Sequence, residues 1–346
     1  MRKIFVRSPY TIKVEEIDMN GSRVELFMWK YGQSVPGTPN FTFTKDIPSP
    51  SQKKNVYNIS NYAKGFIKTI NPVLVSANAT ENINNWCFTR VKRYKRVGTT
   101  FTLLDTIDYV CLYGYTNPNL GYNQGIDDPV VVLMSTNKLY FYNAQSYVNI
   151  FTDYQDGYDT SVVRTKANGT TTTELIASAY QAPNMYKVPI KTTDVVSMLF
   201  TGDENYFTLN TEYLCEAKYT PVSCHFINKF GGWTPLTFFK ASTRNFDVTL
   251  KQFNLLPQSE NYNVLQGLKK DFNHIGTKKV KCNTGWVDEN YNEIIEELML
   301  SETILIDNVP VTLVTKTQKR KTYLKDKNIN FEVEFQYTSN TINDIQ

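Results

Sequence analysis

Two neighbouring residues, Cys224 and His225, are of the types that form a thiolate–imidazole pair, in which the histidine activates the cysteine as a nucleophile. The sequence around them, Ser223–Asn228, predicts a strand. Successive side chains of a strand point to opposite faces, so these two side chains would not reach each other. We therefore do not expect this pair to be catalytic.

Other signatures of catalysis are also missing from the sequence. There is no GxxxxGK[ST] loop, no GxGxxG after a predicted strand, no GxSxG turn and no HExxH helix. The chain contains two histidines, which limits histidine-based catalysis and zinc ligation. The sequence predicts a protein that is not an enzyme, with no catalytic residues.

Three aspartates, Asp153, Asp156 and Asp159, surround Gly157 and suggest a calcium loop. Their spacing does not match D-x-[DN]-x-[DN]-G, and no glutamate stands at the position that a calcium loop requires. An acidic turn is the favoured interpretation. We expect no metal ion and no cofactor.

Two charged segments are candidate interfaces. One is the basic run Arg90, Lys92, Arg93, Lys95 and Arg96, with Tyr94 between its members. It would contact an acidic protein neighbour or nucleic acid, or form a solvated face that prevents sheet aggregation; the solvated face is favoured. The other is the acidic set Glu289, Glu293, Glu296 and Glu297. Opposite charges on separate domains suit head-to-tail packing of copies, and this packing is our hypothesis for both segments.

The composition of the 346 residues predicts a mainly-β protein. Hydrophobic residues make up 41% and charged residues 20%, which is a globular balance. The chain holds 23 Tyr and 20 Phe, and aromatic residues favour strands. The net charge of +4 and the pI of about 8.5 are too mild for a protein that binds nucleic acid by charge, so no specific nucleic acid is expected.

Targeting signals are not visible either. The chain opens on charged residues with no apolar signal region, and the longest apolar stretch, Val130–Met134, is far shorter than a membrane span. The odd number of cysteines, without CxxC spacing, predicts buried thiols in a reducing compartment. These residues are Cys87, Cys111, Cys215, Cys224 and Cys282. We expect a protein made in a cytoplasm.

The chain is longer than one core usually supports, so we expect three domains. Residues 1–116 predict an immunoglobulin-like or fibronectin-like β-sandwich. It would include a hairpin turning at Asn20-Gly21, a short helix capped by Ser60 and a strand over Trp86–Val97. Residues 117–255 predict a second sandwich, separated from the first by the Asn-, Gly- and Pro-rich segment Thr116–Asp128.

Residues 256–346 predict a small β-α-β-β-β module. An amphipathic helix over about 288–300, capped by Asp288, would bury Tyr291, Ile294, Ile295 and Leu298 on one face. Glu297 would then lie on the solvent side. A hairpin with a turn at Asp307-Asn308 would follow the helix, and alternation from Ile329 to Tyr337 predicts the last strand.

Several segments of this sequence together resemble virion structural proteins of tailed phages that infect Bacteroidota, the crAss-like and flavobacterial phages. They carry no catalytic motif, and the resemblance lies in their co-occurrence and order. The segments are Arg7–Tyr10, Asn20–Trp29, Ile47–Pro50 with Tyr57–Tyr62, Phe226–Trp233, and Asn283–Trp286 followed by Leu298–Ser301.

This resemblance implies a structural role in a ring of the tail, tail tip, baseplate or neck of the virion, and it assigns no functional residues. The expected partners are copies of the chain itself and other tail or neck proteins. A tail adhesin or carbohydrate-binding module, with a host glycan as its ligand, is the alternative, because Tyr and Trp platforms suit sugars. A depolymerase-type enzyme is a more distant third interpretation.

Overall fold

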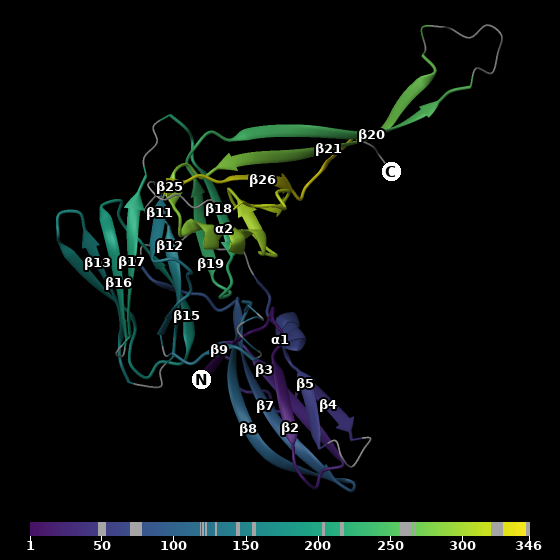
Figure 1. The fold of residues 1–346 in the computed structure, drawn as a ribbon, viewed down its shortest axis with the longest axis vertical. Coiled ribbons are helices and arrows are strands. Elements are labelled where there is room, and N and C mark those ends of the chain that lie inside the picture. The colour runs from purple at the N-terminus through teal and green to yellow at the C-terminus, as the bar shows by residue number, and fades with distance from the viewer. Residues whose placement is uncertain are drawn as a thin grey trace. The chain divides into compact units, whose positions relative to one another are not determined.

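The structure is a computed structural model, shown in Figure 1. It describes residues 1–47, 53–69, 78–117, 119, 121, 123–128, 130–142, 146–153, 157–202, 205–214, 218–256, 265, 267–319 and 328–343. Strands account for 55% and helices for 6%, so the prediction of a mainly-β protein is confirmed. The several sheets are consistent with tandem sandwiches followed by a small C-terminal module.

The chain forms two compact units. The first contains Met1–Leu214 and Phe226–Pro235, and the second contains Cys215–His225 and Leu236–Gln346. These units do not test the three predicted segments 1–116, 117–255 and 256–346, which stay predictions. Each unit is described separately below.

A six-stranded sheet opens the first unit, in the order β4-β3-β7-β8-β1-β9. Its longest hairpin pairs β7 with β8 in an antiparallel register, and β7 has the predicted bounds. The segment after it is one long strand, β8, and the register between the two strands shifts between Arg93 and Tyr94. The bounds are β1 Arg2–Phe5, β3 Gly21–Trp29, β4 Phe41–Asp46, β7 Trp86–Val97, β8 Thr100–Leu112 and β9 Gly125–Ile126.

The hairpin predicted at Asn20-Gly21 is wrong. Strand β2 (Thr11–Glu15) pairs with β5 (Lys54–Asn58), whereas β3 pairs with β4 and β7. Gly21 begins β3, where a Cβ atom would lie 2.8 Å from the guanidinium carbon of Arg96. The glycine therefore allows a close side-chain approach and does not supply a turn with positive φ.

The short helix α1 (Ser60–Phe66) forms where it was predicted, but Ser60 does not cap it. The cap residue is Ile59, whose side chain makes no capping hydrogen bond, and the Asn58 amide oxygen accepts one from the N–H of Ser60 at 3.0 Å. The Ser60 hydroxyl instead accepts a hydrogen bond from the N–H of Tyr10, at 2.7 Å. The serine thus joins α1 to the segment that precedes β2.

Two further sheets complete the first unit, in the orders β10-β12-β15-β6 and β11-β17-β16-β13-β14. Trp86, Phe88 and Leu112 of the first sheet pack in one hydrophobic cluster with Phe151 and Met185 of the four-stranded sheet. The bounds are β6 Thr80–Glu81, β10 Val130–Val132, β11 Lys138–Phe141, β12 Tyr147–Thr152, β13 Thr160–Lys166, β14 Thr171–Ala177, β15 Asn184–Pro189, β16 Val195–Gly202 and β17 Asn205–Tyr213.

A larger sheet, in the order β19-β18-β23-β24-β26-β21-β20 with β27 also on β21, makes up most of the second unit. Its residues Asp307 and Asn308 both have positive φ, of 49° and 65°, as a two-residue hairpin turn requires. The predicted hairpin there is confirmed. The bounds are β18 Val222–Ile227, β19 Trp233–Phe238, β20 Thr243–Asn254, β21 Lys269–Asn283, β22 Val287–Asp288, β23 Ile304–Ile306, β24 Val309–Leu313, β25 Asn328–Ile329, β26 Glu332–Tyr337 and β27 Thr341–Asn343.

The C-terminal helix α2 spans Tyr291–Met299, and its predicted apolar stripe is buried. Two details of the prediction are wrong. The cap residue is Asn290 rather than Asp288, whose carboxylate accepts a hydrogen bond from the Asn290 N–H at 2.9 Å. Glu297 is 4% exposed and therefore not on the solvent side. Its neighbour Leu298 is fully buried, so the buried face is wider than the stripe.

Candidate functional site

The basic run predicted as an interface lies on β7, and its arginines are neutralised within their own sheet. Arg90 stands directly opposite Asp108 on β8 and donates two hydrogen bonds to its carboxylate, each 2.8 Å long. Arg93 stands opposite Asp105 and makes the same forked contact. These carboxylates raise the pKa of both guanidinium groups.

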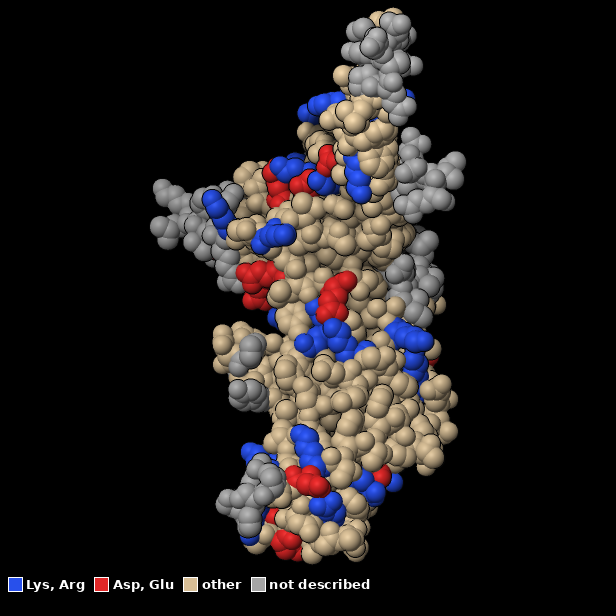
Figure 2. Space-filling view, turned by 90° about the vertical axis from the view of Figure 1, so that its right-hand side faces the viewer, with Lys and Arg blue, Asp and Glu red and all other residues tan. Residues whose placement is uncertain are grey.

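The remaining members of the run also have partners in the first unit. Lys95 forms an ion pair of 3.1 Å with Asp18, and Arg96 one of 2.8 Å with Asp46. The Lys92 ammonium lies 4.8 Å from the centre of the Phe27 ring. Figure 2 shows red acidic residues beside blue basic residues at its lower end. The run is therefore a locally balanced surface.

The acidic residues predicted as its counterpart do not share one exposed face. Glu293 is exposed, Glu289 and Glu296 are half-buried, and Glu297 is buried. Glu289 precedes the helix, whereas the other three lie on it. Glu293, Glu296 and Glu297 each interact with another residue. Their charges are thus partly engaged within the second unit.

Cys224 and His225, the possible thiolate–imidazole pair, alternate in burial along β18. Cys224 is fully buried, and its burial raises the pKa of the thiol, while His225 bonds to Ser223 at 3.2 Å. The predicted alternation of these side chains in a strand is confirmed. Cys87, Cys111 and Cys282 are also buried and free, as predicted, and Cys215 lies outside the described residues.

The aspartates of the suspected calcium loop have separate roles. Asp153 accepts hydrogen bonds from the Met1 ammonium at 2.6 Å and from Lys3 at 3.3 Å. Asp159 accepts one from the N–H of Ala179 at 2.7 Å, and Asp156 lies outside the described residues. Among the described residues, no group of three or more His, Cys, Asp or Glu side chains is placed to hold a metal ion.

A different feature, the hairpin formed by β20 and β21, stands out in the second unit. Figure 1 shows it as a two-stranded ribbon that extends beyond the rest of its sheet. Strand β26 pairs with the Lys279–Asn283 part of β21, and β27 pairs with the His274–Gly276 part. Lys269–Phe272 of β21 pairs only with β20 in the described part of the chain. Among the described residues, no further strand therefore covers the outer half of the hairpin.

Large apolar side chains of this hairpin face solvent. Every residue of β20 is exposed, although its alternating pattern is that of a half-buried strand. The exposed fractions are Phe246 56%, Val248 49%, Leu250 38%, Phe253 44% and Phe272 42%. An exposed apolar patch of this kind usually marks an interaction surface.

Two local arrangements order these side chains. A Cβ atom on Gly276 would lie 2.2 Å from the Phe246 ring, so the glycine lets this ring lie across β21. Further out, the register shifts between Thr249 and Lys251, opposite Asn273, which has a φ of 54°. Beyond this shift, the rings of Phe253 and Phe272 pack edge to face with centres 5.5 Å apart.

The hairpin is also strongly basic. Its two strands contain seven Lys and Arg residues and two Asp residues. Lys279 forms an ion pair of 2.6 Å with Asp247, and Lys281 one of 2.6 Å with Glu332; both contacts raise the lysine pKa. Four other lysines form no ion pair with the described residues. These are Lys251, Lys269, Lys270 and Lys278.

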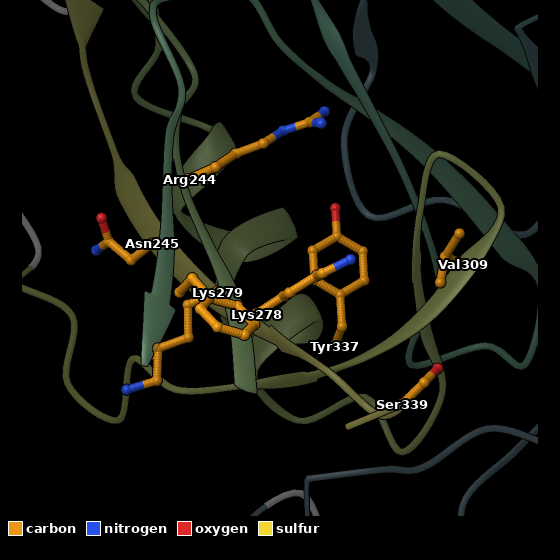
Figure 3. Close-up of a pocket in the computed structure, with 8 residues that line it drawn as sticks. Arg244, Asn245, Lys278, Lys279, Val309, Tyr337 and Ser339 are labelled. Carbon is orange, nitrogen blue, oxygen red and sulfur yellow. The ribbon is translucent and has the colours of Figure 1, made fainter. Parts of the chain in front are cut away.

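A hollow of about 530 Å³ lies at the base of the hairpin (Figure 3). Phe246, Val309 and Tyr337 give it an apolar lining, and Arg244 and Lys278 add positive charge. In Figure 3, Asn245 and Lys279 extend to the other side of the strands. Burial raises the pKa of the Tyr337 hydroxyl. The hollow suits a side chain that is mainly apolar and that ends in a carboxylate or lies next to one.

Sequence reasoning missed this hairpin as a site. The alternation of Phe246, Val248 and Leu250 is visible in the sequence, but it predicts a strand with one face buried. The excess of lysines from Lys269 to Lys281 was the available signal, because lysine is common on open sheet edges.

Comparisons with known proteins do not assign a family. No protein-family model matches the chain, and no curated protein matches it. Among the described residues, no helix is long and apolar enough to cross a membrane.

Proposed function

We propose that this protein is a structural, non-enzymatic subunit of a tailed-bacteriophage virion, in the tail, tail tip, baseplate or neck, and that it assembles by docking its β20–β21 hairpin on a neighbouring virion protein. The resemblance of its sequence segments to phage virion proteins supports the setting. The exposed apolar hairpin supports the mode of action and is the observation that carries the proposal.

An isolated two-stranded hairpin is at best marginally stable in water, and the outer half of the β20–β21 hairpin has no third strand or helix among the described residues. Burying one Phe, Val or Leu side chain contributes about 1.5–3 kcal/mol. Docking Phe246, Val248 and Leu250 would therefore offset the loss of conformational freedom in the hairpin.

The contact is placed on the hairpin rather than on the basic run of β7. A partner that used Arg90 or Arg93 would compete with the aspartates that already neutralise them. Exposed ion pairs contribute little to affinity even when they form. The hairpin offers both apolar area and unneutralised charge.

The experiment compares two triple variants in a phage that lacks its own copy of the gene. One carries Phe246→Ser, Val248→Thr and Leu250→Thr; the control carries Leu175→Thr, Tyr180→Ser and Val196→Thr, which are also exposed apolar residues. Mass spectrometry of purified particles measures incorporation. We expect the control chain in the particle and at least a ten-fold loss of the hairpin variant.

Two outcomes would overturn the proposal. One is the absence of the unmodified chain from purified particles. The other is equal incorporation of both variants, which would place the assembly contact elsewhere. Binding of a host polysaccharide by the purified, monomeric protein would favour an adhesin instead.

A further inference from the structure

The open edge of β20 indicates which kind of partner the hairpin takes. We infer that β20 accepts an extended acidic strand from a different protein, which adds to the sheet next to β20. This inference rests on the proposed function in one respect, that the partner is another virion protein. Its evidence is the backbone geometry, the charge and the side-chain pattern of the hairpin.

The backbone geometry provides the hydrogen bonds. Strand β20 has 12 residues and pairs only with β21 in the described part of the chain. Every second residue of an edge strand directs its N–H and C=O groups away from the sheet. At about 3.4 Å per residue, β20 offers an open edge about 40 Å long. Such an edge is a template for a further strand.

The charge excludes a second copy of this chain as the favoured occupant. Two hairpins placed edge to edge would pair two β20 strands, each with two basic residues and one acidic residue, and each followed in its sheet by the five lysines and one aspartate of β21. This excess of positive charge on both sides repels a second copy. The same excess attracts an acidic segment, because Lys251, Lys270 and Lys278 have no carboxylate partner among the described residues.

The side-chain pattern specifies the alternation of the partner. Phe246 and Val248 stand opposite Lys278 and Gly276, so all four lie on one face of the hairpin. An added strand would place every second side chain, which is apolar, beside Phe246 and Val248. Its remaining side chains would point to the opposite face, where Lys251 lies. The hollow lined by Phe246, Tyr337 and Arg244 would take a side chain at one end of this row. The partner strand therefore alternates apolar and acidic residues.

A nucleic acid fits these features less well. Single-stranded nucleic acid binds to aromatic rings that present their faces to the bases. Here Phe253 and Phe272 pack against each other. On the other face, the row that begins with Phe246 continues with the aliphatic side chains of Val248 and Leu250. An open strand edge supplies main-chain donors and acceptors that a peptide strand matches at every second residue.

The first test uses fluorescence anisotropy with three labelled probes and the full chain. The probes are a capped nonapeptide of alternating Val and Glu, its Val and Lys counterpart, and a nine-nucleotide oligothymidine. We expect the Glu peptide to bind at least ten-fold more tightly than the other two at low salt, and to weaken as salt screens the lysines. Equal or tighter binding of the oligothymidine, or of the Lys peptide, would overturn the inference.

Charge-reversal variants locate the site. Lys251→Glu with Lys270→Glu changes two exposed lysines on one face of the hairpin, and Lys316→Glu with Lys319→Glu is the control, because it changes two exposed lysines of the same unit outside the hairpin. The hairpin variant should bind the Glu peptide at least ten-fold more weakly, and the control should stay within about two-fold of the unmodified protein, since its exposed charges lie elsewhere. Equal losses would overturn the placement at β20.

Backbone N-methylation of the Glu peptide tests strand addition itself. One version is methylated at its odd positions and the other at its even positions, so each loses the donors of one edge while its side chains are kept. We expect one version to lose binding and the other to retain it; any other pattern would overturn strand addition. If these tests fail while the particle experiment succeeds, the hairpin docks by its apolar face alone and the proposed function stands.

Discussion

The protein contains two long antiparallel hairpins with basic residues, β7–β8 in the first unit and β20–β21 in the second. In β7–β8, two arginines stand opposite aspartates, Arg90 with Asp108 and Arg93 with Asp105. In β20–β21, three lysines stand opposite aromatic residues, Lys278 with Phe246, Lys251 with Phe272 and Lys270 with Phe253. The register between strands therefore decides whether a basic residue is neutralised in place or left available to a partner.

Burial separates the two hairpins as well. Strand β7 lies between β3 and β8, and the ends of this hairpin contribute Trp86, Phe88 and Leu112 to a hydrophobic cluster. Strand β20 lies at the end of its sheet, and all of its residues are exposed. One hairpin stabilises its own unit, whereas the other presents apolar area to the outside.

The largest expected difference comes from truncating one leucine in each hairpin. Leu112→Ala removes a fully buried side chain and should lower the free energy of unfolding by about 2–5 kcal/mol. Leu250→Ala, at a position that is 38% exposed, should change the free energy of unfolding by no more than about 1 kcal/mol. Urea denaturation of both variants measures the difference. Equal losses would mean that the β20–β21 hairpin packs as tightly as β7–β8.

Lys187 is a buried cation and so differs from the basic residues of both hairpins. Lys187 on β15 is 8% exposed, it forms no ion pair with the described residues, and burial lowers its pKa from 10.5 to about 8. Its ammonium lies 5.6 Å from the centre of the Tyr147 ring. Below about pH 8, the buried charge of Lys187 lowers the stability of the folded state. Between about pH 8 and 10.5, Lys187 is neutral in the folded chain and protonated in the unfolded chain, so this loss of stability diminishes as the pH rises.

Lys187→Met should therefore stabilise the protein at pH 7, by up to about 3 kcal/mol at 1.36 kcal/mol per pKa unit. The gain should fall by more than half at pH 9.5, because the unmodified Lys187 is then neutral in the folded state. Urea denaturation at the two pH values measures the gain. If Lys187→Met raised the free energy of unfolding equally at both pH values, the gain would come from side-chain packing and not from removal of the charge.

The smallest expected effect concerns the ion pairs of β7–β8. Asp108→Asn weakens the forked contact with Arg90 and should lower the free energy of unfolding by up to about 1 kcal/mol, because both side chains are about a third exposed. Lys278→Gln in the other hairpin should leave it unchanged, since Lys278 has no ion pair among the described residues to lose. Thermal unfolding at low and high salt measures both changes, and only the first should diminish with salt. A destabilising Lys278→Gln would contradict the assignment of this lysine to a partner.

The sequence by itself determined the mainly-β class, because the alternation of aromatic and β-branched residues that favours a strand lies within a few consecutive residues. It placed β7 at its observed bounds and the two-residue turn at Asp307 and Asn308, where the chain needs two residues with positive φ. It also predicted the buried stripe of α2, since spacings of three and four residues align on one helical face. These features depend on contacts between residues close together along the chain.

Only the tertiary structure decided which strands pair and which faces are covered. Asn20-Gly21 predicted a local hairpin, but β3 pairs with β4 and β7, and Gly21 makes room for Arg96. Arg90 and Arg93 looked available until the register placed aspartates opposite them. The alternation of Phe246 and Val248 is that of a half-buried strand, but β20 is the edge of its sheet and both side chains are exposed. Strand pairing joins residues far apart in the sequence, so the alternation of one strand does not determine what covers it.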